Sequence, residues 1–404
     1  MAEIPMLIIL AGLAAYTVLA GADFGAGLWT LLAGGERDDD AIRSYARHAM
    51  GPIWEANHVW LILVLVVCWT AYPVAYGSIT STLAVPLFIA AIGIILRGAS
   101  YALRGQLDGA RGGRAIEYLF ALSSILTPFA LGTVAGAIAA GRVPVGNAQG
   151  DQISSWLNPT SVLIGVLAVA TGAYLAAVYL AADARRLGSE TFERAFRTRA
   201  LISGLFAGAV ALVGLFVVHF DAPALFAGLT SGGGVVMVAV SAAAGLGTLL
   251  LVWRDQLGAA RVSAAVAVAA IVAGWAFAQQ PRFLPGLTVE QAAAGRSTLL
   301  AVVVAVAAGA VVLIPSLILL FRLFLRGRFD PTAETSTPVV PLRAAAPVAR
   351  ATVLGAAACV TLLAGATLTV FADGGLLRAL GIICLFVCAT STFVLATMQP
   401  DGQA

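Results

Sequence analysis

The sequence predicts an all-α polytopic membrane protein. Of its 404 residues, 60% are hydrophobic and only 11% are charged, whereas soluble globular domains contain about 25% charged residues. Apolar stretches of about 18 residues or more recur along the whole chain, and each is long enough to cross a membrane as a helix. The net charge is only +3, and no long basic tract is present. This composition excludes a soluble enzyme and gives no sign of a nucleic-acid partner.

Eleven apolar segments can be marked along the chain. The first contains an acid, Glu3, and has no basic flank before it, so we expect Met1–Gly34 to be a span rather than a cleaved signal peptide. The predicted spans cover approximately residues 5–33, 52–71, 77–104, 115–140, 160–183, 200–219, 224–253, 262–279, 297–325, 349–372 and 376–397.

Arginines are distributed unevenly between the connections. All 23 basic residues are arginine, and most follow the odd-numbered spans. The alternate loops and tails hold only Arg142, Arg282, Arg296 and Arg378. Because cytoplasmic loops carry excess arginine, the N terminus is predicted to lie outside and the protein to be a multi-pass component of the bacterial cytoplasmic membrane.

A loop rich in proline and threonine divides the chain. Residues 329–348 are predicted to form a cytoplasmic linker. It separates a nine-span helical bundle, residues 1–328, from an additional two-helix transmembrane hairpin and tail, residues 349–404. A "SGGG" stretch beginning at Ser231 lacks the context of a phosphate loop and indicates a local helix break.

Few ionisable residues lie inside the apolar spans. Asp23, Glu55, Arg97 and Glu117 all fall in the cytoplasmic half of their predicted helices. Such residues are costly in hydrocarbon and mark a proton path, a ligand contact or a structural pair. The cluster could admit protons from the cytoplasm. Alternatively, Asp23 and Arg97 form a buried structural pair, and Glu117 is a solvated acid at a helix end.

The second span opens with "GPIWEANHVWLI", which places several polar and aromatic residues together. Glu55 is a candidate for proton conduction or a redox-linked contact, with Asn57 and His58 beside it. Trp54 and Trp60 are interpreted either as interfacial aromatic residues or as contacts to a neighbouring subunit or quinone. A di-iron bundle needs two Glu-x-x-His pairs and further glutamates. The chain has one such pair and three histidines, so no metal or haem site is predicted in it.

Two motifs resemble subunit II of the cytochrome bd family of quinol oxidases. "GADFGAGLW" is similar to the family's Gly-Phe-Asp-x-Gly-x-Gly motif in helix 1, and "WEANHVWL" to its Trp-Asp-Gly-Asn-x-Val-Trp-Leu motif in helix 2. The resemblance extends over roughly residues 5–328. The matching residues are Gly21, Asp23, Gly25, Gly27, Trp54, Asn57, Val59, Trp60 and Leu61.

The resemblance implies a haem-free subunit of a quinol:dioxygen oxidoreductase. Its partner would be a homologous subunit I that carries haem b and haem d, in a heterodimer that oxidises quinol and reduces dioxygen to water. A small accessory subunit and a bound quinone are further expectations. The family's proton-path carboxylate in helix 2 carries over to Glu55, and its helix 1 acid and helix 3 arginine carry over to Asp23 and Arg97. Glu55 and Asp23 are therefore both expected to take part in proton transfer. Polar or structural lining near the partner is expected from Trp54, Asn57, His58, Trp60 and Arg97.

The sequence departs from the family pattern at three motif positions. Glu55 replaces the usual aspartate, Ala56 the usual glycine and Ala22 the usual phenylalanine. Two other functions remain open: a proton-coupled secondary transporter, for which paired broken helices are not found, and a purely structural assembly subunit.

Overall fold

The computed structural model describes residues 1–32, 45, 54–103 and 110–325, together with scattered residues between 360 and 388. The side chains of residues 54–56, 102–103, 110–117 and 320–325 lie outside this description. Contacts divide the chain into two units, residues 1–329 and 330–404. All the elements described below belong to the first unit.

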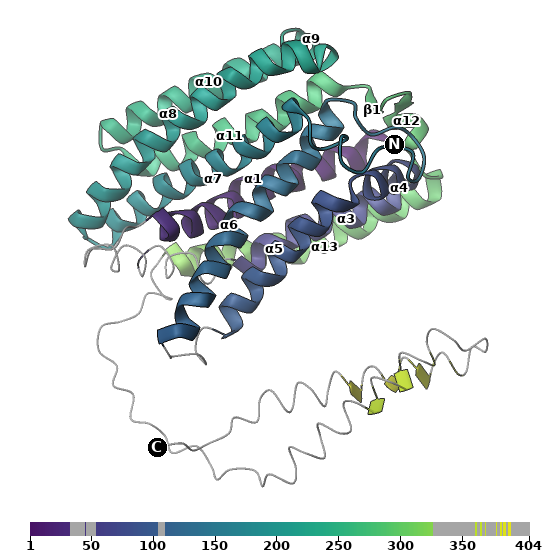
Figure 1. Ribbon diagram of the computed structural model, residues 1–404, viewed down its shortest axis with the longest axis horizontal. Helices are drawn as coiled ribbons and strands as arrows, with labels where there is room; N and C mark the ends of the chain where they lie inside the picture. Colours follow the sequence, from purple (N-terminus) through teal and green to yellow (C-terminus); the bar gives the residue numbers. More distant parts are fainter. Residues whose placement is uncertain are drawn as a thin grey trace. The chain divides into compact units, whose positions relative to one another are not determined.

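The first unit is built from helices of very different lengths and one small hairpin (Figure 1). In chain order the elements are α1 (Glu3–Leu32), α3 (Trp54–Ala71), α4 (Pro73–Thr82), α5 (Ala84–Leu103), α6 (Ala110–Ala139), α7 (Pro159–Arg186), α8 (Glu190–Asp221), α9 (Pro223–Leu229), α10 (Gly232–Trp253), α11 (Leu257–Gln279), β1 (Arg282–Leu284), β2 (Leu287–Thr288), α12 (Val289–Ala292) and α13 (Arg296–Leu325).

Helix α1 lies in the interior of this unit. It packs against α3, α6, α7 and α11 (Figure 1). Helix α7 also packs against α6, α8 and α11, while α5 packs along α6. Helix α1 is therefore covered by four other helices, and polar residues on α1 are shielded on several sides.

Eight of the described helices are long and apolar enough to cross a membrane. Helix α3 contains a shorter apolar stretch, Asn57–Ala71. The predicted class of all-α polytopic membrane protein is confirmed. The division into nine spans plus a C-terminal pair stays a prediction, because the linker and most of the hairpin lie outside the described residues.

Two predicted continuous spans are interrupted. The segment expected at 77–104 instead begins at Pro73 and breaks between α4 and α5 at Leu83. Pro86 lies in the first turn of α5 and cannot donate to the carbonyl one turn earlier, which explains the break. The segment expected at 224–253 is likewise divided into α9 and α10. The predicted break at "SGGG" is present: Ser231 precedes α10, and Gly232 has a φ of +50°.

The other differences are at the ends of elements. Helix α8 begins at Glu190, about ten residues before the predicted span, because its polar first turns continue beyond the apolar stretch. The antiparallel β1–β2 hairpin and the single turn α12 were not predicted. They lie in a connection too short and too mixed in composition to show a periodic pattern.

The contact between α1 and α7 is very close. A Cβ atom placed on Gly25 would lie 1.9 Å from the carbonyl oxygen of Gly172. Only glycine allows the two backbones to approach this closely. The main apolar cluster, which includes Trp29, Leu175, Phe196 and Val268, is built around this contact.

Candidate functional site

Asp23 and Arg97 form an ion pair inside the helical unit. Nη2 of Arg97 donates to Oδ1 of Asp23 at 2.7 Å, and Nε donates to Oδ2 at 3.2 Å. Nη2 also donates to the main-chain carbonyl of Asp23 at 2.9 Å. The Asp23 residue is 1% exposed and Arg97 is fully buried. The predicted pairing of these two residues is therefore present, and both carboxylate oxygens are engaged by one guanidinium group.

The remaining face of the guanidinium contacts α6 and aromatic rings. Nη1 of Arg97 donates to the hydroxyl of Ser124 at 2.7 Å, and that hydroxyl donates to the carbonyl of Phe120. The guanidinium carbon lies 4.4 Å from the ring centroid of Phe120 and 4.8 Å from that of Phe24. Charge-assisted hydrogen bonds and cation–π contacts together compensate for removing this cation from water.

A glycine on α1 makes room for this arrangement. A Cβ atom on Gly27 would lie 2.0 Å from the Ser124 hydroxyl and 3.2 Å from Nη1 of Arg97. Gly27 follows Asp23 by one helical turn, so it lies on the same face of α1. The spacing of Asp23 and Gly27 thus provides both the anion and the space that the arginine needs.

Asn57 attaches α3 to α1 beside the ion pair. Its Nδ2 atom donates to the carbonyl of Leu19 at 3.3 Å, and the residue is 1% exposed. His58 is half-buried, with its ring edge-on to Tyr16 at 6.4 Å between centroids. Trp60 packs against a small cluster that includes Phe24. These three candidates of the second span therefore all lie at the seam between α3 and α1.

The acid of the second span can be placed by its backbone only. Glu55 and Trp54 lie in the first turn of α3, and their side chains are outside the described residues. Helix α3 runs antiparallel to α1, because Trp60 and Val64 lie beside Gly12 while Asn57 bonds to Leu19. Each helical residue advances about 1.5 Å, so the backbone of Glu55 reaches roughly the depth of Asp23.

Glu117, the fourth residue of the cluster expected from the sequence, can be placed only by its backbone within α6. The Glu117 side chain lies outside the described residues. His219 is near the end of α8, between the rings of Phe220 and Phe226. Among the described residues, no group of three or more His, Cys, Asp and Glu side chains could hold a metal ion.

A family model described as cytochrome bd terminal oxidase subunit II matches residues 1–324. This chain belongs to that family. The matched region includes α1, α3 and α5, which supply Asp23, Asn57 and Arg97. The resemblance noted in the two sequence motifs is thereby confirmed.

Curated relatives are similar over part of the chain. Subunit 2 of the cytochrome bd ubiquinol oxidase of Bacillus subtilis (strain 168) is 27% identical over 150 residues, 37% of this chain and 43% of the relative. Subunit 2 of the cytochrome bd-I ubiquinol oxidase of Escherichia coli (strain K12) is 24% identical over 171 residues, 41% of this chain and 44% of the relative. The alignments thus span less than half the length of these relatives.

A solved structure supports the same fold. A chain of the bd oxidase from Geobacillus thermodenitrificans superposes with a TM-score of 0.64 at 24% sequence identity, covering 80% of this chain and 98% of that chain. At 24% identity this similarity establishes the fold of the chain and does not by itself assign a function to it.

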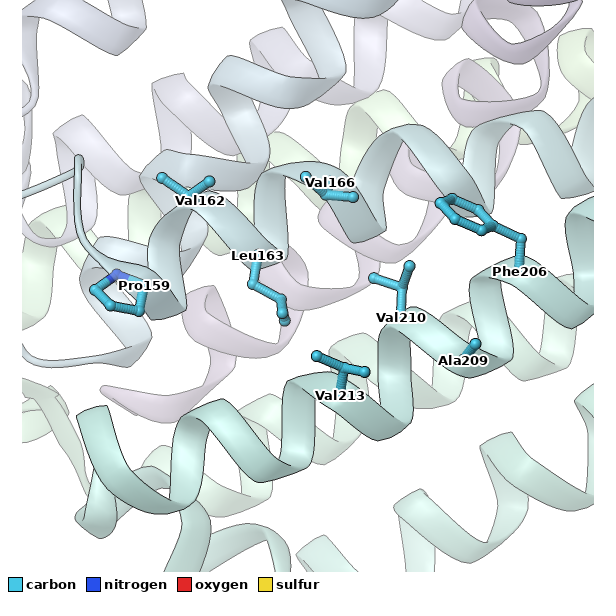
Figure 2. Close-up of a pocket in the computed structure, with 8 residues that line it drawn as sticks. All are labelled: Pro159, Val162, Leu163, Val166, Phe206, Ala209, Val210 and Val213. Atoms are coloured by element: carbon cyan, nitrogen blue, oxygen red, sulfur yellow. The ribbon is translucent and has the colours of Figure 1, made fainter.

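A groove on the surface of this chain is lined by apolar residues only and does not include Asp23 or Arg97. It has a volume of about 450 Å³ and is bounded by α7 and α8 (Figure 2). Because its lining offers no charged or hydrogen-bonding side chain, it cannot carry acid–base chemistry. The lining residues are Pro159, Val162, Leu163, Val166, Phe206, Ala209, Val210 and Val213.

Several partners of the ion pair were not identified from the sequence. Ser124, Phe120 and Phe24 surround the guanidinium of Arg97. A serine or phenylalanine inside an apolar span carries no special signal, because most such residues only pack or bond within their own helix. The one available indication is the spacing of Phe120 and Ser124, which places both on one face of α6.

Proposed function

We propose that this chain is the haem-free subunit of a membrane quinol:dioxygen oxidoreductase of the cytochrome bd type. It supports a partner subunit I that carries haem b and haem d, and it helps deliver cytoplasmic protons for the reduction of dioxygen to water. Membership in the subunit II family and the names of the curated relatives support this proposal.

The buried Asp23–Arg97 pair is the observation on which the proposal depends. Ionisable groups inside a membrane protein are costly and by default functional. This pair lies in the segment matched by the family model, and the motif resemblance assigns the family's helix 1 acid and helix 3 arginine to these two residues. It gives the interior of the bundle a fixed polar centre.

Glu55 and Asp23 receive different parts of the proton-transfer role. Both oxygens of Asp23 accept bonds from Arg97, so we assign to Asp23 the task of fixing the charge and the geometry of the centre. Glu55, at a similar depth on α3, is assigned the exchange of protons. Protonation of Asp23 would break its ion pair with Arg97, so we assign the exchange of protons to a second carboxyl group.

The polar and aromatic residues of α3 complete the proposal. Asn57 holds α3 on α1, and we propose that Trp54, His58 and Trp60 form lining near the partner subunit. The N terminus is proposed to lie outside and the protein to reside in the bacterial cytoplasmic membrane, in accord with the arginine distribution. A bound quinone and a small accessory subunit are further parts of the proposed assembly.

Glu55→Gln in the assembled oxidase tests the proton-transfer role. The substitution keeps the size and polarity of the side chain and removes its ability to ionise, so quinol-driven oxygen consumption should fall about 10-fold or more while haem content stays unchanged. Glu290→Gln, at an exposed position of α12, is the matched control and should retain full turnover. Full turnover in Glu55→Gln would remove Glu55 from the proton path.

A purely structural assembly role is the alternative that one observation favours. Each carboxylate oxygen of Asp23 accepts a hydrogen bond from Arg97, and Arg97 also donates to the main-chain carbonyl of Asp23, as would be expected of a structural pair. If Glu55→Gln leaves turnover unchanged and Asp23→Asn prevents assembly, the chain acts as a scaffold only.

A further inference from the structure

Three polar atoms near the ion pair are buried without a hydrogen-bond partner among the described residues. They are the hydroxyl oxygen of Tyr16 on α1, Oδ1 of Asn57 on α3 and the hydroxyl oxygen of Thr127 on α6. The three residues are 7%, 1% and 0% exposed, respectively. Each comes from a different helix, and α3 and α6 both pack against α1.

Asn57 and Thr127 lie about one helical turn from the polar centre, and Tyr16 lies about two turns before Asp23 on α1. Asn57 bonds to Leu19, which lies one turn after Tyr16 on α1. Tyr16 belongs to a cluster with Ala20 and Phe24, and Phe24 lies against the guanidinium of Arg97. The tyrosine and the asparagine therefore border the seam that leads to the ion pair.

Thr127 approaches the same centre from α6. It follows Ser124, which bonds to Arg97, by three residues. Across the interface it faces Gly93 of α5, where a Cβ atom would lie 2.1 Å from the Thr127 hydroxyl. Gly93 precedes Arg97 by one turn. Leu131, one turn after Thr127, packs against the Tyr16 cluster, so α6 connects the arginine to the tyrosine.

Leaving such atoms unpaired would be unfavourable in this environment. A buried hydroxyl or amide oxygen without a partner loses the hydrogen bonds that water gave it in the unfolded chain, and nothing in the folded chain replaces them. A membrane-spanning bundle is surrounded by hydrocarbon rather than by water. A polar atom that becomes exposed by a small fluctuation therefore still finds no hydrogen-bond partner. Buried polar groups in proteins are commonly satisfied by internal water, which takes two to four polar partners.

We propose that Tyr16, Asn57 and Thr127 bind ordered water inside the bundle, next to the Asp23–Arg97 pair. Water is both donor and acceptor, so it can donate to Oδ1 of Asn57 and bond to either hydroxyl. On the proposed function, such water would lie on the α1–α3 seam from which Glu55 is assigned to exchange protons; that consequence rests on the proposed function, whereas the hydration itself does not.

Removal of single hydroxyl groups from the full chain, in the assembly purified from its membrane, tests the hydration. Tyr16→Phe and Thr127→Val each remove one oxygen atom with little change of shape. If the hydroxyls bond to water, both substitutions should lower the midpoint of thermal unfolding, by about 2–4 °C for a loss near 1 kcal/mol. If the hydroxyls are dry, removing them relieves a desolvation cost and the midpoint rises or stays unchanged.

Two controls calibrate the size of the change. Thr17→Val, on the same helix as Tyr16, removes a hydroxyl that bonds to the Leu13 carbonyl within α1, so it should change the midpoint little. Tyr72→Phe removes a hydroxyl that donates to the carbonyl of Ala2. The decrease in the midpoint of thermal unfolding of this variant shows the effect of losing one hydrogen bond from a buried tyrosine. An unchanged or raised midpoint in either Tyr16→Phe or Thr127→Val overturns the proposal.

X-ray radiolytic labelling in ¹⁸O-water provides a second readout that does not depend on stability or on oxidase activity. Hydroxyl radicals formed from an internal water modify the nearest reactive side chain. Tyr16 should incorporate ¹⁸O despite its burial. Trp29, which is 8% exposed and whose indole nitrogen donates to the Ala173 carbonyl, is the matched control and should incorporate much less. Equal, low labelling of both residues would contradict the proposed hydration.

Discussion

Arg97 holds Asp23 at three points: both carboxylate oxygens and the main-chain carbonyl. The last bond ties the side chain of α5 to the backbone of α1, so the pair fixes the relative position of two helices as well as neutralising two charges. A buried ion pair of this kind is costly to break from one side only, because the remaining charge is left without a counter-ion.

Asp23→Asn should destabilise the protein strongly. The substitution leaves the fully buried Arg97 cation uncompensated, and the expected loss is about 3–5 kcal/mol. The yield and the thermal midpoint of the purified assembly measure it. Asp221→Asn is a comparison variant, because Asp221 pairs with Arg142, whose side chain is 42% exposed; a much smaller loss is expected there. Equal effects of the two substitutions would argue against the central role of the buried pair.

Gly25→Ala should separate α1 from α7. The new methyl group would lie 1.9 Å from the Gly172 carbonyl oxygen, and because that obstacle is backbone, the helices themselves must move. Overpacking of this kind costs about 1–3 kcal/mol or more. Gly208→Ala on α8 is the control: no atom lies within 4 Å of its added Cβ position, so the change should be neutral or stabilising. Equal thermal midpoints for the two variants would contradict the close contact.

Arg261→Met should loosen the start of α11. Nη2 of Arg261 lies 2.5 Å from Oδ1 of Asp183, whose side chain is 6% exposed, and donates to the carbonyl of Tyr179. Losing the cation leaves a buried carboxylate on α7 with fewer partners, so faster amide exchange is expected in the first turns of α11. Arg194→Met removes a pair with Glu190 that is about 80% exposed and should leave exchange unchanged. Identical exchange in both variants would show that the buried pair contributes nothing.

Asp151 gives the loop before α7 a pH dependence. Its carboxylate accepts hydrogen bonds from the amides of Ile153 and Ser154, and these bonds lower its pKa below the ordinary value of 3.8. A lowered folded-state pKa means that the stabilising contribution is complete above that ordinary value and disappears as the pH falls through the lowered one. The two amides should therefore be equally protected from exchange at pH 7 and at pH 5, and should lose this protection as the pH falls below 3.8, after correction for the intrinsic rate. Asp151→Ala should remove this protection at both pH values; retained protection would contradict the assignment.

The helical membrane class and most span positions were predictable because hydrophobicity and length decide them locally. Asp23 and Arg97 were candidates because charges are rare in such spans, and their pairing was one of two interpretations. The break at Leu83 was missed although Pro86 signals it, because the apolar composition continues across the proline. Composition alone therefore located the spans better than it located their interruptions.

Residues that matter only through tertiary contacts could not be predicted. Tyr16 and Thr127 look like ordinary span residues, and only the packing of α1, α3 and α6 shows that their hydroxyl groups have no partner within the described part of the chain. Asp183 and Arg261 could be interpreted only as loop charges, because nothing in their sequence separation indicates that α7 and α11 are adjacent. The side chain of Glu55, the first candidate for proton transfer, lies outside the described residues.

The central claim is that this chain serves a haem-bearing partner in a quinol-oxidising complex. A reduced-minus-oxidised absorption spectrum of the affinity-purified full chain, taken from its native membrane together with whatever polypeptides accompany it, tests this claim most directly. Bands of haem b and haem d are expected to follow a second polypeptide and not this chain once the two are separated. A stable preparation that contains this chain but shows neither haem would contradict it.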